Sequence, residues 1–165
     1  MYRRGHWGVA LLVFAPLGFA LSSLGRTDLA LAGGAVMLWL AMLPDYDVRV
    51  PGLSHRGPTH TLAFALVVGA VGAGAGGGLA VAADRPHATV VGLALFGFAI
   101  ATLAVLAHLL ADALTPSGVP FLWPLSGRRY SLHVVRADNA LANLGLLALG
   151  VSATVAAAVV AVNVV

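Results

Sequence analysis

Cysteine, lysine and glutamate are all absent from this sequence of 165 residues. Without cysteine, the chain can form neither a disulfide nor a metal site built on thiolates. Without lysine and glutamate, side-chain acid–base chemistry is limited to aspartate, histidine and tyrosine. A site for metal or proton chemistry therefore has to draw on the six aspartates, six histidines and three tyrosines.

Charged residues of any kind are scarce. They make up 9% of the chain, whereas 60% of the residues are hydrophobic and the mean hydropathy is +0.96, which is typical of an integral membrane protein. A pI of about 10.2 is also found in nucleic-acid-binding proteins, but nine arginines spread over several short loops fit membrane orientation better. We expect a lipid bilayer as partner and no nucleic acid, with the oligomeric state left open.

Five apolar segments follow one another along the chain. A membrane-spanning helix needs about 20 apolar residues, and all but the second segment are close to that length or longer. We therefore expect one all-α, polytopic membrane domain over residues 1–165. Its spans are predicted at residues 7–24, 29–43, 62–83, 88–110 and 140–165. The glycine-rich tract at 69–78 falls inside the third span, which indicates close helix packing rather than a flexible linker.

The distribution of arginine predicts how the spans are oriented. If the N-terminus is cytoplasmic, seven arginines lie on the cytoplasmic side and only Arg26 and Arg85 on the other. By the positive-inside rule we expect a multi-pass protein of the cell (inner) membrane with a cytoplasmic N-terminus and the C-terminus on the opposite side. This topology also puts five of the six histidines and four of the six aspartates at the cytoplasmic face.

The end of the fourth span carries the motif His108-Leu109-Leu110-Ala111-Asp112. Residues four apart share one helix face, so His108 and Asp112 could bind one cation together. The alternative is a local hydrogen bond for His108 and a capping role for Asp112. An ionisable residue at the centre of a span costs about 2.5–3.5 kcal/mol on insertion scales, which favours a functional role.

The loop Leu43–Thr61 brings further ligand types to the same face. We expect Asp45 and Asp47 to alternate in an extended turn after Pro44, and the turn at Gly57 to aim His55 and His60 into one pocket. Two carboxylates and two imidazoles suit zinc, with manganese or iron as other choices, and contain too much nitrogen for a calcium site.

Each of these residues also has a structural alternative. Asp45 and Asp47 could pair with Arg49 and Arg56, and His60 could cap the third span. His133 lies alone in a later loop and is not expected to bind metal. Six candidates converging on one face favour a site over coincidence.

The order of the motifs resembles the YdjM-like family, inner-membrane proteins linked by name to LexA binding and described as membrane-bound metal-dependent hydrolases. The resemblance extends from Gly5 to about Leu132 and is most specific in the second and third motifs. The motifs are Gly5-His6-Trp7-Gly8, Leu43-Pro44-Asp45-Tyr46-Asp47, His55-Arg56-Gly57-Pro58-Thr59-His60-Thr61, His108-Leu109-Leu110-Ala111-Asp112, Thr115-Pro116-Ser117-Gly118-Val119 and Trp123-Pro124.

The resemblance implies a helical membrane hydrolase with distant kinship to zinc phospholipase C and P1-type nucleases. It implies metal ligands among His6, Asp45, Asp47, His55, His60, His108 and Asp112. In the mechanism we expect, zinc activates water, Asp47 acts as general base, and Arg56 holds an anionic group. Thr59 and Thr61 are available to orient ligand imidazoles. A site at the lipid–water boundary suits an amphiphilic or phosphate-containing substrate.

A non-enzymatic role competes with this interpretation. A transporter would place ionisable groups near the bilayer midplane, whereas here they gather at one end. A structural metal clasp or a regulatory partner fits the same residues, and four protein ligands in a closed tetrahedron would favour the clasp. The loop 115–138 is either a segment covering the site or an ordinary connector, and we favour the connector.

Overall fold

The structure is a computed structural model that describes residues 1–164, and Val165, the last residue of the fifth predicted span, lies outside the described residues. Five long helices account for most of the chain. They are α1 (Arg3–Ser23), α2 (Thr27–Leu40), α3 (Leu62–Ala82), α4 (His87–Ala113) and α5 (Ala140–Val164). Two short 3-10 helices, η1 (Pro44–Arg49) and η2 (Pro58–His60), lie between α2 and α3.

All five predicted spans are helices long and apolar enough to cross a membrane. The second span reaches that length only as Thr27–Arg49, because α2 has 14 residues and η1 follows it after the turn at residues 41–43. The helix ends lie within a few residues of the predicted boundaries; α1 begins at Arg3 and α4 continues to Ala113. Residues 1–164 form no strand, so the all-α prediction is confirmed.

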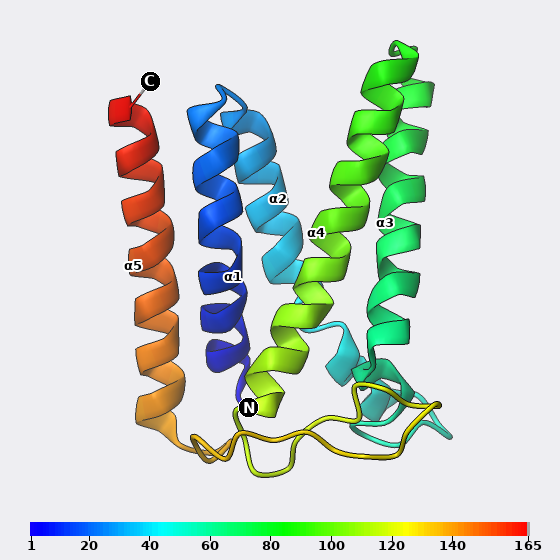
Figure 1. The fold of residues 1–165 in the computed structure, drawn as a ribbon, viewed down its shortest axis with the longest axis vertical. Helices are drawn as coiled ribbons and strands as arrows, with labels where there is room; N and C mark the ends of the chain where they lie inside the picture. Colours follow the sequence, from blue (N-terminus) through cyan, green and yellow to red (C-terminus); the bar gives the residue numbers. More distant parts are fainter. Residues whose placement is uncertain (165) are drawn as a thin grey trace.

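The helices run up and down side by side, and the long loops collect at one end (Figure 1). α1 packs along α5, α3 packs along α4, and α2 contacts both α1 and α4. The chain starts at the lower end in Figure 1 and α5 finishes at the upper end. We call the lower end the polar end; it comprises the N-terminal residues, residues 41–61, the end of α4 and residues 114–139.

Glycine allows two of these helix pairs to approach closely. A Cβ atom on Gly72 would collide with the backbone of Gly97, and one on Gly97 would collide with Gly72, so α3 and α4 touch through their backbones. Between α1 and α5, a Cβ atom on Gly150 would collide with the backbone of Gly8, and one on Gly8 with the backbone of Leu146. The glycine-rich tract in α3 therefore serves helix packing, as its position inside a span predicts.

The loop between α4 and α5 is a connector that crosses the polar end (Figure 1). Its backbone is fastened to helix ends: Leu62 N–H donates to the Phe121 carbonyl at 2.9 Å, and Leu132 N–H to the Ala113 carbonyl at 2.7 Å. Val119 and Tyr130 form an isolated antiparallel bridge. These bonds hold the loop against the bundle beneath α3 and α4.

Candidate metal centre

Buried polar side chains concentrate at the polar end, where α1, α4 and the two 3-10 helices meet. The interior between α1, α2 and α4 is otherwise apolar, with Phe14, Met37 and Ile100 at its centre. The site residues come from separate elements. They are His6 of α1, Asp45 and Asp47 of η1, His60 of η2, and His108 and Asp112 of α4.

Four ligand atoms converge on one point at this end. Asp45, His60, His108 and Asp112 each contribute one nitrogen or oxygen, and all four atoms lie within 4.8 Å of one another. The two histidine Nε2 atoms are 3.2 Å apart. Asp45 Oδ1 lies 3.4 Å from His60 Nε2 and 3.5 Å from His108 Nε2, and Asp112 Oδ2 lies 3.6 Å from both nitrogens. We call these four residues the cage.

The dimensions of the cage fit a tetrahedral metal ion. Zinc binds nitrogen and oxygen at about 2.0–2.2 Å, so the edges of its ligand tetrahedron measure about 3.3–3.6 Å. The five edges given above span 3.2–3.6 Å. Two imidazoles and two carboxylates are also ligand types that zinc accepts. Three of the four side chains are almost completely buried, and Asp45 keeps 25% of its side chain exposed.

Hydrogen bonding on the far side of the His108 ring turns its Nε2 lone pair toward the cage. Nδ1 lies 2.7 Å from the Ala41 carbonyl oxygen, which can only accept, so Nδ1 carries the proton. In the tautomer protonated on Nδ1, the lone pair is on Nε2. Ala41 is free to accept because α2 ends at Leu40 and the helix does not continue past Pro44.

His60 is oriented in the same sense. Thr59 Oγ1 donates to Asp47 Oδ2 at 3.0 Å and therefore accepts from His60 Nδ1, also at 3.0 Å. Burial lowers the pKa of His60, which keeps the ring neutral. Two nitrogen lone pairs and two carboxylate oxygens then face one another with no donor between them, an arrangement that a cation would stabilise. Thr59 thus takes the orienting role expected for it, whereas Thr61 caps α3 by accepting from Phe64 N–H at 3.1 Å.

The expectation that Asp45 and Asp47 share one extended turn is wrong, because η1 is a 3-10 helix. Successive residues of a 3-10 helix turn by about 120°, so residues two apart point in different directions, whereas in a strand they would point the same way. Asp45 consequently faces the cage. Asp47 faces His55 and Thr59 and belongs to a second group, formed by Asp47, His55 and His60.

Asp47 accepts hydrogen bonds from three directions. Besides Thr59, the Arg56 backbone N–H donates to Oδ2 at 3.1 Å, and His55 Nδ1 lies 3.0 Å from Oδ1. The rings of His55 and His60 meet edge to face with centroids 5.5 Å apart and share Asp47, as the turn at Gly57 predicts, although the side chain of His55 stays 49% exposed. Asp47 connects the exposed His55 with the buried His60.

Arg56 pairs with neither Asp45 nor Asp47. Its guanidinium donates to Asp112 Oδ1 at 2.7 Å and to Thr115 Oγ1 at 3.3 Å. The Met1 amino group also lies 2.9 Å from Asp112 Oδ1. One oxygen of Asp112 therefore faces cationic groups and the other faces the cage. Arg49 stacks over the Tyr46 ring at 4.8 Å. The alternative in which Asp45 and Asp47 form ion pairs with Arg49 and Arg56 therefore does not describe this loop.

His6 lies against the cage without being part of it. Its ring stacks on His108 with centroids 4.0 Å apart. His6 Nδ1 donates to the Tyr2 carbonyl at 3.2 Å, which leaves a lone pair on Nε2. Nε2 is buried, lies 3.4 Å from Asp112 Oδ1, and has no hydrogen-bond partner within residues 1–164.

Sequence reasoning missed two contributors, the Ala41 carbonyl and the pairing of Arg56 with Asp112. The helix-breaking Pro44 is the signal for the first, because it predicts unpaired carbonyls in the last turn of α2. No local pattern signals the second, since the two residues are 56 positions apart. His133 contacts Ser131 and belongs to neither of the two groups.

Comparison with known proteins identifies the family. Neither the search of curated proteins nor the search of solved structures found a match to this chain. A family model described as YdjM inner membrane protein matches residues 1–165, the whole chain. This match agrees with the five spans and with the order of the His and Asp motifs, and the chain therefore belongs to the YdjM inner membrane protein family.

Proposed function

We propose that this protein is a membrane-bound metal-dependent hydrolase that holds one divalent cation, zinc in the first instance, in the Asp45–His60–His108–Asp112 cage. The convergence of four acceptor atoms at tetrahedral spacing, with the two imidazole Nδ1 protons engaged elsewhere, supports the metal centre. The observation that carries hydrolysis rather than a purely structural role is the partly exposed Asp45 together with the buried His6 Nε2, which has no hydrogen-bond partner within residues 1–164. When bound, such a cation lowers the pKa of water to about 7 and polarises an ester or phosphoryl oxygen.

The residues around the cage have separate roles in this proposal. Asp47 and Thr59 hold the His60 ring in the ligating tautomer, and Arg56 neutralises the outer oxygen of Asp112. Asp47 was expected to be the general base, but both of its oxygens already accept hydrogen bonds. We assign proton acceptance to His6 Nε2 instead, because this buried atom borders the cage and has no partner within residues 1–164.

We also propose an orientation and a substrate class, based on where the site lies in the bundle. Seven arginines belong to the polar end, namely Arg3, Arg4, Arg49, Arg56, Arg128, Arg129 and Arg136. On the basis of the positive-inside rule, we propose that this end, with the cage, faces the cytoplasm. A centre at the end of a membrane bundle suits a phosphoester or lipid-linked substrate that reaches it from the bilayer.

A structural metal clasp is the second candidate. Four protein ligands complete a tetrahedron, which is the usual arrangement of a structural zinc site. In that role the ion would tie η1 and η2 to α4 without chemistry. The 25% exposure of Asp45 and the unpartnered Nε2 of His6 favour the hydrolase, because a purely structural site requires neither.

The two candidates are separated by a His6→Gln variant, with His133→Gln as a control of the same chemistry in an exposed loop. Both would be purified in detergent, analysed for zinc, and assayed on p-nitrophenyl phosphate, bis-p-nitrophenyl phosphate and a short-chain phosphatidate. The hydrolase predicts that His6→Gln keeps its zinc and loses about 10²–10⁴-fold in rate, as expected for loss of a general base. Zinc-loaded wild type that hydrolyses none of the three would support the clasp.

A further inference from the structure

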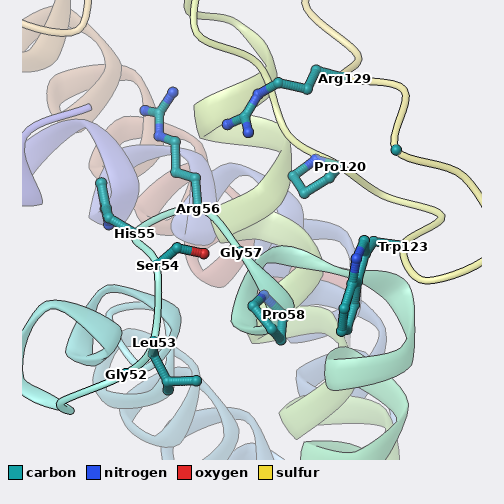
Figure 2. A pocket seen from close by; sticks show the side chains of 11 residues that line it. Gly52, Leu53, Ser54, His55, Arg56, Gly57, Pro58, Pro120, Trp123 and Arg129 are labelled. Carbon is teal, nitrogen blue, oxygen red and sulfur yellow. The ribbon is translucent and has the colours of Figure 1, made fainter.

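A cavity of about 420 Å³ opens at the polar end beside the metal centre. Its wall includes His55, Arg56 and Pro58 from the η1–η2 loop and Pro120, Trp123 and Arg129 from the α4–α5 connector (Figure 2). This volume lies within the range of about 300–1,000 Å³ typical of small-molecule sites. Two loops far apart in sequence thus form one concave surface.

The cavity carries positive charge that is only partly neutralised. Arg129 donates to the carbonyl oxygens of Ser117 at 3.0 Å and Gly118 at 3.3 Å, and Arg56 also reaches the Gly118 carbonyl, at 3.5 Å. The two guanidinium groups therefore share an acceptor and lie close together. Arg56 has Asp112 as its counterion, whereas no carboxylate of residues 1–164 lies within ion-pair distance of Arg129. An anion entering the cavity would supply the missing charge.

Arg129 also lines a second cavity, of about 380 Å³, whose wall includes the apolar side chains of Leu110, Phe121 and Leu132 and the ring of Tyr130. Leu110 belongs to the last turns of α4, a helix long and apolar enough to span a membrane, and is 43% exposed. Trp123, also 45% exposed, has the amphipathic ring favoured at the membrane–water boundary. A ligand here would meet guanidinium groups at one end and hydrocarbon at the other.

We propose that the first cavity binds the phosphate group of an anionic membrane lipid. The phosphate lies between Arg129 and Arg56, the glycerol region beside Trp123, and an acyl chain along Leu110 and Leu132 toward the bilayer. Guanidinium groups suit this role because their planar donors can bind phosphate oxygens in pairs. The proposal deepens the proposed function, since the bound phosphate would lie next to His55 and Arg56, which contact carboxylates of the metal centre. Binding itself requires no hydrolysis.

The experiment uses Trp123 as a reporter. The chain has three tryptophans, so Trp7→Phe and Trp39→Phe leave Trp123 alone. The full-length protein, purified in a non-ionic detergent, is titrated with dihexanoyl phosphatidic acid, dihexanoyl phosphatidylcholine or inorganic phosphate. Native mass spectrometry counts bound lipid in parallel. We expect saturable binding of phosphatidic acid, weaker binding of inorganic phosphate and none of phosphatidylcholine.

Two variants decide the assignment. Arg129→Gln should weaken phosphatidic acid binding by roughly tenfold or more, because the guanidinium without a counterion is lost. Arg136→Gln removes the same charge from the same connector, but Arg136 pairs with Asp138 outside the cavity, so binding should stay unchanged. Equal losses in both variants, or none in Arg129→Gln, would overturn the proposal.

The probes separate the remaining outcomes. Inorganic phosphate that binds as tightly as phosphatidic acid would replace the lipid assignment with a simple phosphate site. Equal binding of phosphatidylcholine would show that charge does not select the ligand and would overturn the proposal. The lipid recovered after incubation is then analysed for cleavage. Intact phosphatidic acid, together with binding that depends on Arg129, would contradict hydrolysis of this lipid but not the binding site.

Discussion

The two ends of α4 carry the same kind of residue in opposite circumstances. His87 begins the helix, is exposed, and belongs to no ligand group in residues 1–164. His108, near the other end, is completely buried, bonded through Nδ1 to Ala41 and directed through Nε2 at His60. The difference is in the surroundings. At the polar end, three separate segments supply partners to α4, so burial and hydrogen bonding together determine the tautomer of His108 and the direction in which its Nε2 points.

Asp28 and Asp112 show the same contrast between an exposed and a buried position. Asp28 pairs with Arg26 two residues away, and both side chains are more than half exposed. Asp112 pairs with Arg56 across 56 residues, and both are buried. An exposed pair adds little to stability because water and salt screen it. A buried pair whose partner is removed leaves a charge without compensation, and that loss is large.

The largest expected effect is therefore that of Asp112→Asn compared with Asp28→Asn. Asp112→Asn leaves the Arg56 guanidinium buried without its counterion and should cost about 3–5 kcal/mol of stability. Asp28→Asn should leave the melting temperature unchanged within error. Thermal unfolding of both variants in the same detergent measures the difference, and equal melting temperatures would contradict the buried pairing.

A second comparison concerns two neighbouring threonines. Thr59→Val removes the hydroxyl that accepts from His60 Nδ1, and loss of such an orienting partner costs about 10–100-fold in metal affinity. Thr61→Val removes the cap of α3 and a hydrogen bond to the Pro58 carbonyl, but no contact with the His60 ring. Loss of the cap costs about 1 kcal/mol of stability, and metal affinity should stay unchanged. Competition with a chelator measures both affinities. The orienting role of Thr59 fails if the two variants bind metal equally.

The smallest expected effect is a dependence of stability on pH. Burial lowers the pKa of His60, so below its ordinary value of 6.5 the unfolded chain takes up a proton that the folded chain does not. Stability should therefore fall as the pH is lowered from 7.5 to 5.5, and loss of bound metal acts in the same direction. The decrease in melting temperature should be smaller in His60→Gln and unaltered in His87→Gln. A decrease of the same size in all three proteins would show that His60 is not its source.

The sequence alone predicts the five spans and part of the metal centre. The features of the site that it does not predict have physical causes. Hydrophobic length predicts the five helices, and four-residue spacing predicts that His108 and Asp112 share a face. The split between Asp45 and Asp47 was not predicted, because it depends on η1 being a 3-10 helix rather than extended. The pairing of Arg56 with Asp112 depends on how a loop folds back onto α4, which no local pattern encodes.

The most direct test of the metal cage is the metal content of the detergent-purified protein, measured by mass spectrometry for wild type, His60→Ala, His108→Ala and the control His87→Ala. One zinc or comparable divalent ion per chain in wild type and His87→Ala, lost from both cage variants, is the result expected from four ligands on three segments. No tightly bound metal in wild type, or metal that both cage variants retain after reloading, would contradict the cage and the hydrolase proposal with it.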